Sequence, residues 1–156
     1  MSENIVFTRV DNRLIHGQVA NLWVKSVPCN LVVVVDDETA SNEVLKAVMK
    51  MTTDSVGVGV RFFTIEKTIN TISKASASQQ IMIVAKTIQT IRKLVEGGVN
   101  IKECNIGNLH YSEGKTRYKE DHIYVDQQDL DDIEYLKQKG LNVYIQVFPG
   151  DTKYTL

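Results

Sequence analysis

Short apolar segments of strand length alternate with amphipathic segments of helix length along the whole chain. Strands are expected at residues 5–10, 31–35, 56–63, 81–85, 101–106, 123–125 and 142–148. The segment 31–35 is one leucine and four valines, which is typical of a strand covered on both faces. This alternation implies right-handed crossovers. The sequence therefore predicts an α/β fold: a doubly wound, mostly parallel sheet of about six to seven strands with helices on both faces.

The intervening helices are indicated by apolar stripes and capping residues. A first helix over residues 16–25 is expected to bury Val19, Leu22 and Trp23. Ser41 is the expected N-cap of the second helix. The buried side of that helix is expected to carry Val44, Leu45, Val48 and Met49. The expected N-caps of the later helices are Thr64, Thr87 and Asp126.

Length and composition narrow the class of protein further. The 156 residues, 43% of them hydrophobic, suffice for the core of one domain, here residues 1–156. The 18 basic and 19 acidic residues form no basic block, which argues against nucleic-acid binding. The longest apolar run is too short to span a bilayer, and residues 1–4 do not resemble a signal peptide. Cys29 and Cys104 are too few for a disulfide framework or a metal site. We therefore expect a cytosolic protein without a bound metal.

In open parallel sheets, functional sites gather where strands end and lead into helices. The corresponding loops here are residues 11–15, 36–40, 86–87 and 107–119. The first is the richest in chemistry, with His16 three residues after Arg13. A neutral imidazole nitrogen can attack phosphorus, and a helix N-terminus, Gly17 and an arginine supply donors and charge for a phosphoryl group. Asp11 is placed to orient His16 or Arg13. The competing interpretation is a polar histidine without chemistry.

Other polar residues at strand ends suggest weaker hypotheses. Asp36 and Asp37 with Lys86 are similar to a phospho-aspartate receiver site, but the third strand lacks the acceptor aspartate that such a site requires. His110 is expected at the same sheet edge as His16, as a solvated loop residue or part of a binding surface. His122 begins a strand and is expected at the opposite edge. The chain has no phosphate-binding loop of the Walker type, so no nucleotide cofactor is expected.

Residues 9–19, RVDNRLIHGQV, resemble the active-site loop of the IIB components of mannose/fructose/sorbose-family sugar phosphotransferase systems. Within them, the match over Arg13-Leu14-Ile15-His16-Gly17-Gln18 is specific to the family. Four further segments resemble the branch specific for N-acetylgalactosamine or galactosamine: RFFTIEKTIN (61–70), KLVEGG (93–98), NIGNLH (105–110) and YSEGK (111–115). One departure is Asn12, where much of the family has a second aspartate.

The resemblance implies that His16 carries a phosphoryl group as a phosphohistidine. Its donor would be the IIA component, and its acceptor a sugar held by the membrane components IIC and IID. Arg13 and Asp11 would assist His16, while Gly17, Gln18 and Asn12 would surround the phosphoryl group. The relay needs no cofactor.

The predicted topology also suggests which residues surround the site. Asp37, Lys86 and His110 would lie at the rim where partners dock. Such a protein would be cytoplasmic and peripherally associated with its transporter, and it could form a homodimer. Two alternatives remain: a non-catalytic or regulatory binding module of the same fold, and a IIB component for mannose, fructose or sorbose.

Overall fold

A computed structural model describes residues 4–156; residues 1–3, which belong to the segment considered for a signal peptide, lie outside it. The strands are β1 (Ile5–Asp11), β2 (Leu31–Val35), β3 (Gly59–Phe63), β4 (Ile81–Ala85), β5 (Glu103–Asn108), β6 (Thr116–Tyr118), β7 (Glu120–Val125), β8 (Asn142–Ile145) and β9 (Tyr154–Thr155). The helices are η1 (Val19–Val24), α1 (Asp37–Ala40), α2 (Glu43–Ser55), α3 (Ile65–Thr71), η2 (Ile72–Lys74), α4 (Ile88–Glu96) and α5 (Gln127–Gln138).

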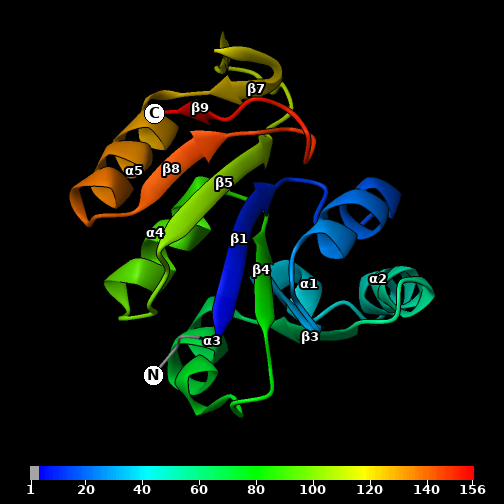
Figure 1. The fold of residues 1–156 in the computed structure, drawn as a ribbon. Coiled ribbons are helices and arrows are strands. Elements are labelled where there is room, and N and C mark those ends of the chain that lie inside the picture. The colour runs from blue at the N-terminus through cyan, green and yellow to red at the C-terminus, as the bar shows by residue number, and fades with distance from the viewer. Residues whose placement is uncertain (1–3) are drawn as a thin grey trace.

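Seven strands form the main sheet in the order β3-β2-β4-β1-β5-β8-β9 (Figure 1). All neighbouring pairs are parallel except β8 and β9. Strand β1 lies near the centre, and the chain crosses from it to β2 and β3 on one side before returning to β4 and β5. The predicted doubly wound, mostly parallel sheet is therefore confirmed. The small C-terminal strand β9 was not predicted.

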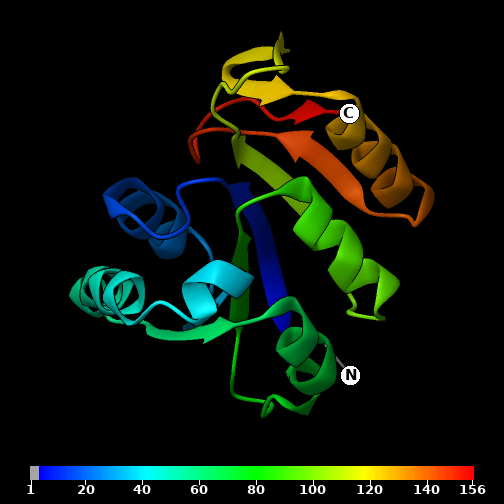
Figure 2. The same ribbon diagram turned by 180° about the vertical axis from the view of Figure 1, so that it is seen from behind.

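Helices cover both faces of the sheet, because alternate strand residues point to opposite sides. Val33 and Val35 of β2 pack in one apolar cluster with residues of α4 and α5. Val32 and Val34 pack in a second cluster with Trp23 of η1 and Met49 of α2. Figure 2 shows α3, α4 and α5 on the side that faces away in Figure 1. No helix among the described residues is long and apolar enough to cross a membrane.

Capping was predicted better than helix orientation. Thr64, Thr87 and Asp126 are N-caps, as expected. Ser41 is not, because the short helix α1 ends there and the Asn42 side chain accepts from the first N–H groups of α2 instead.

The expected buried sides of two helices are wrong in part. Val44 and Val48 of α2 are 73% and 56% exposed, because the helix turns Met49 toward the sheet. Leu22 is also exposed. It lies in the π-helix η1, whose i→i+5 bonding spreads each turn over more residues and rotates Leu22 away from the sheet.

The segment after β5 differs from the predicted long loop over residues 107–119. Gly107 and Asn108 belong to β5, and the hairpin of β6 and β7 forms a separate two-stranded sheet. This hairpin is joined to the end of β5, where the Leu109 N–H donates to the carbonyl of His122 over 3.0 Å. The expectation that His122 lies at the opposite edge is therefore wrong, because β7 does not continue the main sheet.

Candidate functional site

The site is built around the Asp11 carboxylate, at the carboxyl end of the central strand β1. Its Oδ2 lies 3.2 Å from Nη2 of Arg9, 3.0 Å from Nη2 of Arg13 and 3.4 Å from Nε2 of His16. Its Oδ1 accepts from the backbone N–H and from Nε of Arg13, each over 3.0 Å. The Asp11 side chain is completely buried. The Asp11 carboxylate thus contacts both other residues that the sequence singled out, Arg13 and His16, and also Arg9.

The loop after β1 is a tight turn that brings these residues together. The Leu14 N–H donates to the Asp11 carbonyl over 2.9 Å, and the Asp11 side chain caps the Arg13 N–H. Leu14 adopts a positive φ of 57°, which is uncommon outside glycine. Leu14 and Ile15 are both buried and anchor the turn in the core. The two apolar side chains therefore hold the polar residues on either side of them at the surface.

His16 immediately precedes the helical segment that contains η1, and its side chain is 23% exposed. The Gln18 N–H points to Nδ1 of His16 over 3.3 Å, while Nε2 faces Asp11. Both ring nitrogens thus have a defined environment. Gly17 is exposed, and the nearest atom to a β-carbon placed there would be Nδ2 of Asn21 at 3.9 Å, so the surface beside the ring is open.

Arg13 connects the carboxylate to Gln18. Its Nη1 donates to Oε1 of Gln18 over 3.1 Å, and Nε and Nη2 form a fork on Asp11. Within residues 4–156 these contacts use three of the five N–H donors of a guanidinium. Two donors of this partly exposed side chain therefore have no partner among the described residues and are available to a ligand.

Charges at the site favour an anion. Burial by itself raises the pKa of the Asp11 carboxyl, but hydrogen bonds from His16 and Arg13 and the charge of Arg9 outweigh it and lower the pKa to about 2. Burial lowers the pKa of Arg9 to about 10, although the charge of Asp11 opposes this effect. At neutral pH two guanidinium cations therefore flank one carboxylate, which leaves a net positive charge beside His16.

Asn12 is directed toward the end of β5. Its Oδ1 accepts from Nδ2 of Asn108 over 2.6 Å and from the His110 N–H over 3.3 Å. Its own N–H donates to the Asn108 carbonyl. Asn12 thus fastens the loop to the neighbouring strand and brings the exposed residue His110 beside it.

Asp37 and Lys86 lie at the same edge, after β2 and β4. Oδ1 of Asp37 accepts from the Ile65 N–H at the start of α3. Nζ of Lys86 lies 3.4 Å from Asp36 and 3.3 Å from Glu38. Burial lowers the pKa of Lys86, but these two carboxylates raise it by more, so the residue is a cation. Both side chains are engaged with the loops around α1.

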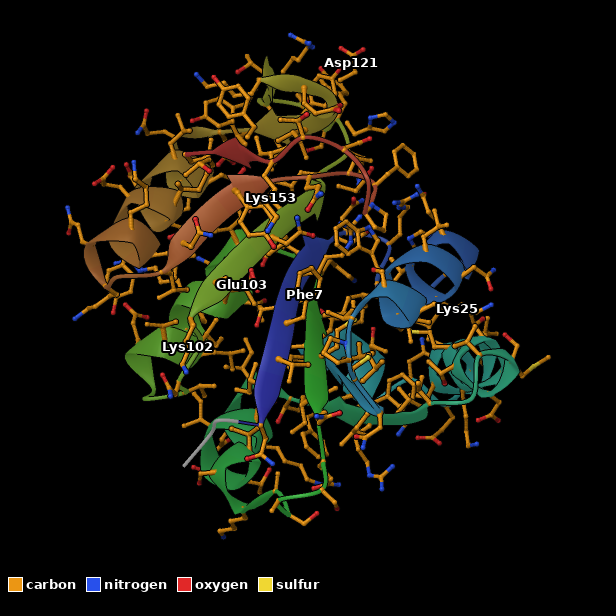
Figure 3. The ribbon with its side chains drawn as sticks, viewed as in Figure 1. Phe7, Lys25, Lys102, Glu103, Asp121 and Lys153 are labelled. Carbon is orange, nitrogen blue, oxygen red and sulfur yellow. The ribbon has the colours of Figure 1, made fainter. Side chains whose placement is uncertain are left out.

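The sequence analysis did not assign Arg9 to the site, although a signal for it was present. A charged residue within an apolar strand segment is unusual, and Arg9 and Asp11 are two positions apart, so they share one face of β1. Figure 3 shows that face, marked by Phe7 on β1 and Glu103 on β5. Among the described residues there is no group of three or more histidine, cysteine, aspartate or glutamate side chains arranged to hold a metal ion.

The fold and the site define a class: a doubly wound α/β protein with a histidine held by a buried carboxylate where the central strand ends. The family described as the PTS system sorbose subfamily IIB component matches residues 5–156. The chain belongs to this family. It is therefore a IIB component of a phosphotransferase system, with the phosphotransferase role of such components.

Individual relatives agree with this assignment. The N-acetylgalactosamine-specific phosphotransferase enzyme IIB component 1 of Escherichia coli (strain K12) is 51% identical over 152 residues, which cover 97% of this chain and 96% of that protein. A crystal structure of the N-acetylgalactosamine-specific IIB component 1 from Escherichia coli has a TM-score of 0.94 at 50% identity, covering 97% of this chain and 99% of the other. An N-acetylgalactosamine IIB component from Streptococcus pyogenes has a TM-score of 0.91 at 38% identity, covering 100% and 96%.

Proposed function

We propose that His16 is the phosphoryl carrier of this IIB component. The observation that carries the proposal is the unequal environment of its two ring nitrogens. Nε2 faces the buried carboxylate of Asp11, and Nδ1 faces the Gln18 N–H at the start of a helix. A carboxylate only accepts hydrogen bonds, so the neutral ring places its proton on Nε2. The lone pair is then on Nδ1, which we assign as the nucleophile.

The first transfer follows from this assignment. The Nδ1 lone pair attacks the phosphorus of a phosphohistidine on the IIA component. The new N–P bond forms as the old one breaks, and the bonding electron pair stays on the donor nitrogen. The proton on Nε2 remains directed at Asp11, which stabilises the ring as it becomes positively charged.

The arriving phosphoryl group is anionic, and the loop offers it positive charge and donors. Among residues 4–156, Arg13 has two N–H donors without a partner. The Gln18 N–H loses its acceptor once Nδ1 is bonded to phosphorus and can then donate to a phosphoryl oxygen. Gly17 leaves space for the group. Asn12 contributes indirectly, because its oxygen is bonded to the end of β5.

In the second transfer a sugar hydroxyl oxygen attacks the phosphorus, an O–P bond forms, the hydroxyl proton is released to water, and the N–P electron pair returns to Nδ1. We propose N-acetylgalactosamine or galactosamine as this sugar. The support is the name of the relative that is 51% identical over nearly the whole chain. A IIB component for mannose, fructose or sorbose is the alternative, and competition between these sugars in uptake would distinguish them.

The partners in this proposal are a IIA component as donor and the membrane components IIC and IID, which hold the sugar. Asp37, Lys86 and His110 follow strand ends at the same edge of the sheet as His16, and we assign them to the rim where partners dock. A single domain over residues 1–156, a cytoplasmic location at the transporter, and assembly as a homodimer belong to the same proposal.

The test is phosphorylation of the purified chain by phosphoenolpyruvate, the general phosphotransfer proteins and the IIA component. We expect a label that is stable in base and labile in acid, located on His16 by peptide mass spectrometry and on Nδ1 by ³¹P NMR. Without label, although the IIA component itself is phosphorylated, the non-catalytic binding module would be the correct function. Label on Nε2 would contradict only the assignment of the nucleophile.

A further inference from the structure

We propose that Arg9 is a positioning residue for phosphoryl transfer: it holds the Asp11 carboxylate where that group can orient His16 and Arg13. The inference rests on the function proposed above and deepens it. Arg9 is completely buried and bonds directly to Asp11 over 3.2 Å. It would act on the reaction through Asp11, without touching the phosphoryl group.

The position of Arg9 is set on several sides. Asn105 pairs with it across β1 and β5 and accepts from its Nη1 over 2.7 Å. The centre of its guanidinium lies 4.6 Å from the centroid of the Trp23 ring. These neighbours belong to β5 and to the helix η1, so the guanidinium is fixed by the core. Figure 3 labels Phe7 and Glu103 on this face of the sheet. Phe7 is two residues before Arg9, and Glu103 is two residues before Asn105.

The other contacts of Arg9 are duplicated. The Gln146 carbonyl accepts from Nη1 of Arg9 and also from Nδ2 of Asn105 over 3.1 Å. The Val147 carbonyl accepts from Nη2 of Arg9 and also from Nε1 of Trp23 over 2.9 Å. Both carbonyls therefore keep a donor without Arg9. Oδ1 of Asn105 is the exception, because Arg9 is its one donor among residues 4–156, so loss of Arg9 also removes one structural contact.

Asp11 depends on Arg9 in a different way. Its second guanidinium partner, Arg13, has a side chain 38% exposed and is also the residue placed to bind the phosphoryl group. When the two remaining donors of Arg13 bind that group, the charge of Arg13 is shared between two anions, and Arg9 remains as the cation committed to the carboxylate. Asp11 then stays ionised and keeps Nε2 of His16 in place.

Gly107 supports this division of roles. It lies on β5 against the guanidinium, and a β-carbon there would overlap the Cζ and both Nη atoms of Arg9. Its φ is outside the left-handed region, so the glycine is required for space and not for backbone conformation. Gly107→Ala therefore displaces Arg9 without removing any charge from the site.

The decisive measurement is the ratio of Nδ1- to Nε2-phosphohistidine by ³¹P NMR, together with the rate of transfer from the phosphorylated IIA component. If Arg9 aims the ring through Asp11, Arg9→Met and Gly107→Ala will produce Nε2-phosphohistidine that the wild type lacks. Transfer should slow by about ten- to a hundredfold, as for a misplaced reacting group. Arg9→Lys keeps the charge but not the forked guanidinium, so its transfer rate should lie between those of the wild type and Arg9→Met. Gly150→Ala is the matched control, because nothing lies within 4 Å of a β-carbon there.

A double-variant cycle separates positioning from packing. In an Asp11→Asn background, Arg9→Met should change the transfer rate by less than about twofold, because the group it acts through is already altered. The inference would be overturned if the rate reductions caused by Arg9→Met and Asp11→Asn multiply in the double variant and Arg9→Met leaves the ratio of phosphohistidine isomers unchanged. If Arg9→Met does not fold, Arg9→Lys and Gly107→Ala decide the question by the same readouts. Failure of wild-type His16 to accept phosphate would instead contradict the proposed function and remove the basis of the inference.

Discussion

Nη2 of Arg9 lies 3.2 Å from Oδ2 of Asp11, and both side chains are completely buried at the end of the central strand. A buried ion pair contributes little net stability, because desolvation offsets most of the attraction between the charges. Its value here is geometric. The pair places a carboxylate below a surface loop, where it contacts both Arg13 and His16.

His16→Gln should abolish phosphoryl acceptance, because glutamine offers no ring nitrogen that can attack phosphorus. His110→Gln and His122→Gln should retain it, since His110 reaches the loop through its backbone N–H and His122 lies in the separate hairpin. Transfer assays followed by peptide mass spectrometry test this. A phosphoryl group found on His110 would refute the assignment.

Arg13→Lys should slow transfer although it keeps the charge. A lysine cannot form the fork on Asp11, bond Gln18 and still offer two donors to a phosphoryl group. Loss of one charge-assisted contact costs roughly 1.5–3 kcal/mol, which is about ten- to a hundredfold in rate. Stopped-flow or quench-flow transfer kinetics give the rate. A rate within about threefold of wild type would mean that Arg13 has no role in the transition state.

Asp11 should make the stability of the protein depend on pH in acid. Its folded pKa of about 2 lies below the ordinary value of 3.8, so its contribution is complete above pH 4 and is lost as the pH falls through 2. The shift corresponds to about 2 kcal/mol of unfolding free energy. Chemical denaturation of wild type and Asp11→Asn at a series of pH values measures it. Between pH 4 and 2 the unfolding free energy of the wild type should fall more steeply than that of Asp11→Asn. Parallel dependence on pH would contradict a lowered pKa of Asp11.

Asn12→Asp should leave the stability of the fold nearly unchanged, whereas Asn12→Ala should lower it. Both contacts of the side chain are accepted by Oδ1, and a carboxylate can accept the same two hydrogen bonds. The same reasoning explains why this chain can have Asn12 where much of the family has a second aspartate. Asn12→Ala leaves the Asn108 amide without this partner and should lower the unfolding free energy by about 1 kcal/mol. Thermal unfolding of the two variants side by side tests the difference, and equal losses would argue against it.

Much of the fold could be predicted because its signals are local. The valine run of β2, the caps Thr64, Thr87 and Asp126, and the alternation of strands with helices all depend on neighbouring residues. Errors arose where distant packing decides. Val44 looks like a core residue from its spacing but is exposed, because the orientation of α2 is set by how Met49 meets the sheet. The position of His122 was also predicted wrongly, because it depends on β7 joining the end of β5 and not the main sheet.

The sequence by itself determined the α/β class and the segment Asp11, Arg13 and His16, because these residues lie within six positions on one strand end and its loop. Only the tertiary structure decided how that loop is supported. Arg9 bonds Asn105 and the carbonyls of Gln146 and Val147, which are 96 to 138 positions away in the chain. No local pattern encodes such contacts, since they form only when β1, β5 and β8 assemble side by side and their alternating side chains meet on one face.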